Sequence, residues 1–231
     1  MRKLPGWFLE LIWPRGLKCV CCDNYSYGEV LCPECEDSLA SLRLDGKDNE
    51  TDLVRSAYVY DGTARLLVLL LKEECIEAAA MPLAKGMSEV FKQMKLPADI
   101  VLTWVTMPAL RQKKRSFDHG QTLCRAVAEL TGSPCLELLE RVGEPHTQRG
   151  LNKEKRMRNL AGTIRCSQKL NTPVLLIDDV TTTGATAALC AHVLMEAGAT
   201  GVYVLTAAKA AKRKKHDDLY QVNRMITERL I

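Results

Sequence analysis

Several sequence features are missing from this chain of 231 residues, and their absence argues against particular classes of protein. No apolar run is long enough to span a bilayer. Residues 1–14 are apolar but are interrupted by Pro5, Glu10 and Pro14, and no small-residue cleavage site follows, so we expect no signal peptide. The Walker A loop and the glycine fingerprint of dinucleotide-binding domains are both missing. The chain also has little excess charge, since its formal net charge is only +4.

One stretch, VLLIDDVTTTGAT at residues 174–186, has the clearest organisation in the chain. Its first four residues are aliphatic, which predicts a parallel strand covered on both faces. We expect this strand to stop at Asp178 and Asp179, which would then lie at the carboxyl edge where open α/β sheets bind ligands. The alanine-rich run that follows predicts a helix over residues 185–196, closed by Gly198.

The loop between this strand and this helix has the chemistry of a phosphate site. A helix start offers unpaired N–H groups and partial positive charge, and threonine hydroxyls add further donors. Because two carboxylates would repel a bare phosphate, the ligand should also carry hydroxyl groups or a divalent cation. A sugar phosphate meets both conditions. The residues that we expect to hold the phosphate are Thr181, Thr182, Thr183, Gly184, Ala185 and Thr186.

The same stretch resembles the phosphoribosyl pyrophosphate (PRPP) motif of type I phosphoribosyltransferases. The resemblance implies that Asp178 and Asp179 hold the ribose hydroxyls, that the threonine and glycine loop holds the 5-phosphate, and that Mg²⁺ accompanies PRPP. Response regulators also carry acid pairs, and a plain strand–helix unit can show one acid at a strand end. Neither requires the sequence TTTGAT.

Four of the ten cysteines follow the pattern C-x2-C-x9-C-x2-C, which predicts a tetrahedral structural zinc site. Two disulfides are the weaker explanation in a chain without a secretory signal. A closed four-sulfur site leaves no open position for catalysis. The other cysteines, apart from Cys21, are expected to be small buried residues. The expected zinc ligands are Cys19, Cys22, Cys32 and Cys35.

Two polar segments concentrate positive charge. The first follows the apolar strand expected over residues 99–107, and its Arg111 and Arg115 are candidate ligands for a second phosphate group. The second, residues 143–162, is basic and poor in aliphatic residues, and it could form a movable lid. Cations in such a lid would stabilise a departing pyrophosphate. In the lid these are Arg149, Arg156 and Arg158. A solvated surface loop remains the alternative for both segments.

We expect three parts in the chain: an N-terminal helix and zinc-ribbon module over residues 1–47, an α/β domain over 48–208, and a basic tail over 209–231. The tail begins KAAKRKK, which is either solvated or a weak contact for a nucleic-acid backbone. Within the first two parts, periodicity and caps predict helices from Pro33 to about Leu44, from Asp61 to Lys72, from Ala78 to Met94 and from Asp118 to Gly132, and strands at Val54–Tyr60 and Gly201–Ala207.

Together, the order of these motifs resembles the ComF family. The resemblance covers about residues 11–207 and includes CPEC, YDGTARLLVLLLK, RSFDHGQ, TQRGL and DDVTTTGAT. It implies a zinc ribbon followed by a type I phosphoribosyltransferase-like α/β domain, with a parallel sheet and helices on both faces. This chain departs from the family where Ser116 replaces a usual glycine and where WVTMP replaces a Val-Pro-Val-Pro strand end. These departures concern the region that would handle pyrophosphate.

The resemblance implies two alternative functions in DNA uptake and competence. In the first, the protein is a phosphoribosyltransferase that binds Mg-PRPP and transfers its pentosyl group to an unknown acceptor. In the second, it is a non-catalytic adaptor or nucleotide sensor that binds single-stranded DNA and a DNA-uptake helicase through the zinc module and the basic tail. We expect a cytoplasmic protein, with the inner face of the membrane as an alternative location. The sequence leaves the oligomeric state open, a dimer included.

Overall fold

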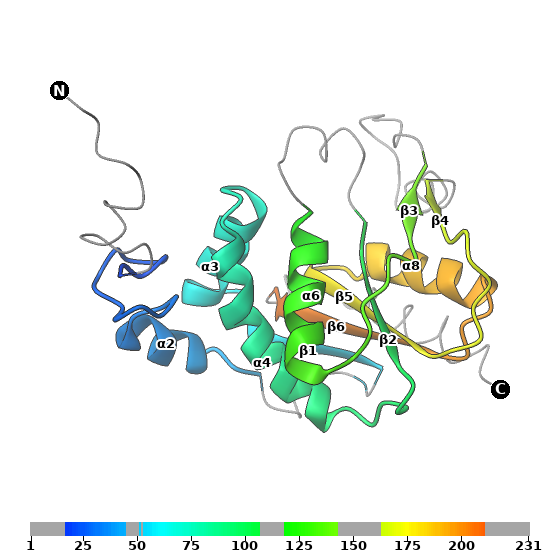
Figure 1. Cartoon of the computed structure of the whole chain (residues 1–231), viewed down its shortest axis with the longest axis horizontal. Coiled ribbons are helices and arrows are strands. Elements are labelled where there is room, and N and C mark those ends of the chain that lie inside the picture. Colours follow the sequence, from blue (N-terminus) through cyan, green and yellow to red (C-terminus); the bar gives the residue numbers. More distant parts are fainter. Residues whose placement is uncertain (1–16, 45–50, 52, 107–117, 143–162, 211–231) are drawn as a thin grey trace, which may run out of the picture.

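The structure is a computed structural model that describes residues 17–44, 51, 53–106, 118–142 and 163–210. A short cysteine-rich module comes first in the chain, and an α/β domain follows it (Figure 1). In chain order the elements are α2 (Pro33–Ala40), β1 (Val54–Val59), α3 (Gly62–Lys72), the 3₁₀ turn η1 (Glu77–Ala79), α4 (Ala80–Gln93), β2 (Val101–Trp104), α6 (His119–Thr131), β3 (Glu140–Arg141), β4 (Ile164–Arg165), β5 (Val174–Thr181), α8 (Ala185–Glu196) and β6 (Val202–Lys209).

Four strands form a parallel sheet in the order β1-β6-β5-β2, which confirms the predicted α/β class. The strand of the VLLIDD stretch, β5, lies between β6 and β2 in the middle of the sheet. It does not stop at the acid pair, as the sequence led us to expect. Pairing with β6 continues to Thr181, opposite Lys209, so both acids belong to the strand itself.

Helices cover both faces of this sheet, as predicted (Figure 1). Side chains alternate along β5: Leu175 and Ile177 enter the core that α3, α4 and α6 close, whereas Val174 and Leu176 enter the core that α8 closes. All four are fully buried. The alternation does not continue to the end of the strand, because Val180 packs against the same core as Leu175 and Ile177.

The helix ends agree closely with their local signals. Asp61 accepts a hydrogen bond from the backbone N–H of Gly62 at the start of α3, and Asp118 accepts from Gly120 at the start of α6. α6 ends at Gly132, which has a φ of 69°. Several boundaries differ from the expectation. α2 ends at Ala40 rather than near Leu44, a 3₁₀ turn precedes α4, and β6 extends to Lys209, which we had assigned to the tail. β2 covers only Val101–Trp104 of the strand predicted over residues 99–107.

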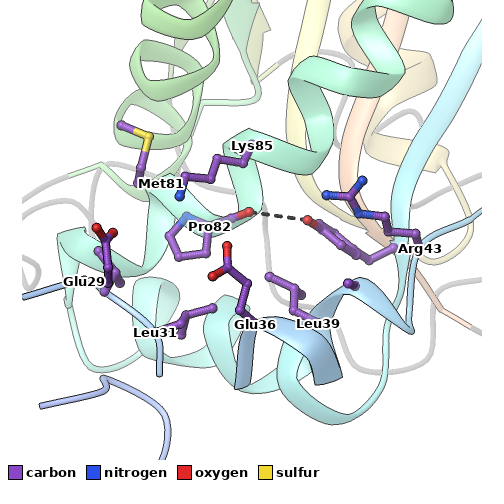
Figure 2. A pocket seen from close by; sticks show the side chains of 11 residues that line it. Glu29, Leu31, Glu36, Leu39, Arg43, Met81, Pro82 and Lys85 are labelled. Atoms are coloured by element: carbon purple, nitrogen blue, oxygen red, sulfur yellow. Dashed lines mark hydrogen bonds between the residues drawn. The ribbon is translucent and has the colours of Figure 1, made fainter. Parts of the chain in front are cut away.

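The cysteine-rich module packs directly against the α/β domain. Leu31 and Leu39 share one core with Tyr58 of β1, and the backbone N–H groups of Leu44 and Val59 bond to carbonyl groups across the junction. A pocket of about 210 Å³ remains between α2 and α4, with Glu29 and Glu36 on its module side (Figure 2). The predicted domain boundary near residue 48 lies outside the described residues.

The remaining cysteines are only partly as expected. Cys124 and Cys190 are fully buried. Cys75, Cys135 and Cys166 are half-buried, because they lie in the connections that follow helices or short strands rather than inside a helix face.

Candidate functional site

The two acids of β5 lie side by side in the last part of the strand, and their charges act on each other. Asp179 contacts residues of α3 and α6. Burial and, after it, the nearby Asp178 charge raise the pKa of Cys190 in α8. The pair therefore forms one site near the strand end, although pairing with β6 continues past it to Thr181.

Asp179 is almost fully buried and is held by two side chains from distant parts of the chain. The Lys72 ammonium group lies 2.6 Å from Asp179 Oδ2, and His119 Nε2 lies 3.3 Å from the same oxygen. Burial acts to raise the pKa of Asp179, but the hydrogen bond from His119 and the charge of Lys72 outweigh it and hold the pKa below its ordinary value. Asp179 is thus a paired carboxylate at neutral pH.

Asp178 has the opposite electrostatic character. It is half-buried, and burial together with the neighbouring Asp179 charge raises its pKa to about 8. Its Oδ1 accepts a hydrogen bond from the backbone N–H of Asp179 at 2.9 Å. Two adjacent acids with pKa values displaced in opposite directions are typical of a functional site.

Beyond β5, a short loop leads into the N-terminus of α8. Thr182 and Thr183 are exposed, and Gly184 has a φ of 70°, which a residue with a side chain would adopt only with strain. No side chain caps this helix by a hydrogen bond of the usual geometry, although Thr183 Oγ1 accepts from the N–H of Ala185 at 3.4 Å. The first turn of α8 therefore directs N–H groups toward the loop, which is the arrangement that binds anions.

Not every predicted phosphate ligand faces this loop. Thr181 is buried, and its hydroxyl bonds to Thr206 Oγ1 of β6 at 3.2 Å, so its side chain belongs to the sheet. Ala185 and Thr186 are half-exposed in the first turn of α8. The basic residues assigned to pyrophosphate lie outside the described residues, namely Arg111, Arg115, Arg149, Arg156 and Arg158.

Sequence reasoning missed Lys72 and His119. Lys72 directly follows Leu71, the last buried residue of an apolar helix, and a cation at that position was a signal that the sequence offered. His119 directly follows the capping Asp118, whose Oδ2 also accepts a hydrogen bond from Trp104 Nε1 at 3.3 Å. These bonds fix the start of α6 to β2 and so position the imidazole ring.

The four predicted zinc ligands come together in the module. The sulfur atoms of Cys19, Cys22, Cys32 and Cys35 all lie within 4.8 Å of one another. A tetrahedral site with Zn–S bonds of about 2.3 Å requires sulfur separations of about 3.8 Å, so the cluster fits zinc. Burial acts to raise the pKa of the Cys19 thiol, but backbone N–H groups, that of Cys32 foremost, lower it to about 7. The pKa values of Cys32 and Cys35 are raised, so zinc would displace their protons when it binds.

The amino-acid sequence is similar to those of named bacterial proteins. No protein-family model matches the chain. The DNA utilization protein YhgH of Salmonella typhimurium is 30% identical over 206 residues, covering 82% of this chain and 88% of that protein. The same protein of Salmonella typhi is 29% identical over 204 residues. Competence protein F of Haemophilus influenzae is 30% identical over 123 residues, covering 51% of this chain and 53% of that protein.

Solved structures also show similarity. The glutamine PRPP amidotransferase of B. subtilis aligns with a TM-score of 0.42 and 17% identity, over 64% of this chain and 34% of that chain. The adenine phosphoribosyltransferase of Leishmania tarentolae aligns with a TM-score of 0.37 and 16% identity, over 62% of this chain and 74% of that chain.

Fold and site define a protein with a parallel α/β domain, acids at the end of a central strand, a helix N-terminus beside them, and a four-cysteine metal module packed on one side. With 30% identity to YhgH over most of both chains, this chain belongs to the ComF family. Among the described residues, none of the helices has the length and apolar character needed to cross a membrane.

Proposed function

We propose that this protein binds PRPP at the carboxyl edge of its sheet. The observation that carries the proposal is the position of the α8 N-terminus directly beyond the acids of β5. The 5-phosphate would lie on Thr182, Thr183 and the first N–H groups of α8, because both threonines are exposed and the N-cap residue Gly184 has no side chain to cap the helix. The ribose would lie against the strand end.

Of the two acids, Asp178 is the better candidate for direct contact with the ribose hydroxyls. It is the less buried, whereas Asp179 Oδ2 is already engaged by Lys72 and His119. Mg²⁺ bound with PRPP would neutralise part of the pyrophosphate charge. Its positive charge would also favour loss of the proton that Asp178 holds at neutral pH, and the resulting carboxylate is a suitable ligand for Mg²⁺ or for its water molecules. We infer that Asp179 serves mainly to hold the site together, since it joins β5 to a residue of α3 and a residue of α6.

Pentosyl transfer would need cations at the leaving pyrophosphate. Our assignment of this role to residues of the two basic segments stays a prediction, and so do the transfer reaction and its acceptor. The proposal therefore rests on binding, which the described residues support by themselves.

We further propose that PRPP binding serves DNA utilisation. The support is that relatives in Salmonella and Haemophilus are named for DNA utilization and for competence. A cytoplasmic location agrees with the cysteine cluster, because four thiolate ligands require a reducing compartment. Single-stranded DNA and a DNA-uptake helicase stay predictions as partners, since the basic tail lies outside the described residues.

Thermal unfolding with and without Mg-PRPP tests the binding proposal. A ligand at a hundred times its dissociation constant stabilises the folded state by about 2.7 kcal/mol, which raises the melting temperature by several degrees. We expect this rise in the wild type and in Asp99→Asn, an exposed acid just before β2 at the opposite end of the sheet. It should be lost in the Asp178→Asn, Asp179→Asn double variant. An unchanged melting temperature in the wild type would remove the proposal.

A further inference from the structure

The zinc module carries two tyrosines whose position is unrelated to the PRPP site. Tyr25 and Tyr27 are 54% and 76% exposed, and Tyr27 is the most exposed of the large hydrophobic residues that the structure describes. Their rings contact each other edge to face, with centroids 4.7 Å apart and an interplanar angle of 81°. Between them, Ser26 is buried and points inward. The two rings therefore form an open aromatic corner on the surface.

The backbone holds this corner in a costly conformation. Ser26 accepts a bond from the N–H of Glu29, and Tyr27 and Gly28 between them have φ values of 56° and 92°. Positive φ at both central positions is the pattern of a type I′ turn, where glycine, asparagine or aspartate is preferred. A bulky residue there is a conformational outlier, and burial of the ring does not compensate for it. Such outliers point to a function.

The turn is also rigid. Ser26 Oγ donates to the carbonyl oxygen of Glu29 at 2.7 Å, and the backbone N–H of Ser26 donates to the carbonyl of Leu17 at 2.8 Å. The metal-binding knuckle lies next to it, where the N–H of Cys19 bonds to the carbonyl of Asn24. A ligand that binds the tyrosines therefore meets a preformed surface and orders little of the protein.

The described part of the zinc module, which carries the aromatic corner, is acidic. Residues 17–44 contain five acidic residues and two basic ones, a formal charge of −3, and four thiolates on one zinc ion would add two further negative charges. The acids flank the tyrosines in sequence and continue along α2. They are Asp23, Glu29, Glu34, Glu36 and Asp37, against Lys18 and Arg43. A cation is attracted to this surface and a phosphate backbone is repelled.

From the aromatic corner and this charge, we propose that Tyr25 and Tyr27 form a docking surface for a basic segment of a protein partner. An arginine or lysine side chain of that segment would enter the corner between the perpendicular rings and bind by cation–π interaction, while neighbouring cations meet the acids of the module. Tyrosine is enriched at protein interfaces because its side chain combines a rigid aromatic ring with a polar hydroxyl group. The surface is independent of PRPP binding.

Single-stranded DNA, the other class of partner with an affinity for exposed aromatic rings, fits this surface poorly. Successive bases stack on separated ring faces beside cations that follow the phosphates. Here the edge of one ring covers a face of the other, and residues 17–44 supply five acids against two bases. The proposal thus assigns the described part of the module to protein recognition. The adaptor alternative assigned both single-stranded DNA and a helicase to the module and the basic tail together.

Binding of two labelled probes to the zinc-loaded, full-length protein distinguishes the two classes. Fluorescence anisotropy is measured with an arginine-rich peptide and with an oligothymidylate. The peptide should bind the wild type, and the Tyr25→Ala, Tyr27→Ala double variant should bind it about tenfold more weakly. Tyr27→Phe keeps the ring and should retain most of the affinity. Leu130→Ala, which truncates an exposed side chain on α6, is the matched control and should bind as the wild type does.

Zinc content and melting temperature are measured for each variant to detect a folding defect. Both should equal the wild-type values, because the replaced side chains are exposed. Equal peptide affinity in the wild type and the double variant would overturn the proposal, and so would a wild type that does not bind the peptide. An oligothymidylate affinity that depends on the two tyrosines would overturn it in favour of nucleic acid.

Discussion

Replacing Lys72 with methionine removes the closest cation from a carboxylate that is almost fully buried. The Asp179 side chain is 7% exposed and its partner Lys72 is 31% exposed, with 2.6 Å between Nζ and Oδ2. Breaking a buried ion pair by removing one partner typically costs about 3–5 kcal/mol. Because Lys72 is partly solvated and His119 remains beside the carboxylate, we expect a smaller loss of unfolding free energy, about 2 kcal/mol at pH 7.

The pH dependence of this loss identifies its cause. A carboxyl group whose pKa is lowered in the folded state contributes stability that is present above the unfolded pKa and is lost as the pH falls. The difference between wild type and Lys72→Met should therefore be full at pH 7 and should begin to shrink below about pH 4, where the variant protonates Asp179 first. It should vanish only when the pH falls through the lowered pKa of Asp179 in the folded wild type.

Urea denaturation across this pH range measures both effects. Lys95→Met, an exposed lysine after α4, is the matched control, and we expect it to change the free energy by less than about 0.5 kcal/mol. If Lys72→Met is as stable as this control at pH 7, or if its deficit does not depend on pH, the assignment of Asp179 as a carboxylate paired with Lys72 is refuted.

Three further outcomes follow from the structure. Gly86→Ala should destabilise the protein by about 3 kcal/mol in urea, because a methyl group on this residue of α4 would overlap the buried phenol of Tyr58; a loss below about 0.5 kcal/mol would contradict this packing. Removing zinc by titrating the cysteine thiols should release one ion per chain, and Cys32→Ser should abolish its binding; a fully folded protein with no bound zinc would disprove the metal site. Because the pKa of Asp178 is raised to about 8, the folded protein holds a proton between pH 4 and 8 that the unfolded chain has released. The free energy of unfolding should therefore fall as the pH rises through this range. An equally steep fall in Asp178→Asn would show that another group is responsible.

The features that the sequence predicted well depend on local interactions. The bounds of α8 match the prediction, as do the caps of α3 and α6, because each is fixed by residues within a few positions of the helix end, such as Asp61, Asp118 and Gly198. The cysteine cluster was equally predictable, because its spacing alone limits the geometry.

The features that the sequence could not give depend on contacts between distant residues. The extent of β5 is set by pairing with β6, which places both acids inside the strand rather than beyond its end. The ion pair between Asp179 and Lys72 joins residues 107 positions apart in the sequence. Local propensity and periodicity describe only neighbouring residues, so they could not predict this pair. Thr181 looked like part of the phosphate loop because its neighbours are threonines, yet its hydroxyl bonds within the sheet.

Isothermal titration of Mg-PRPP into the wild type and into Asp178→Asn tests most directly whether this strand end holds a phosphorylated pentose. We expect saturable binding of one PRPP per chain to the wild type, and binding at least about tenfold weaker to the variant, because one charge-assisted hydrogen bond to a hydroxyl contributes about 1.5 kcal/mol or more. No heat of binding to the wild type, or equal affinity in the two proteins, would contradict the account.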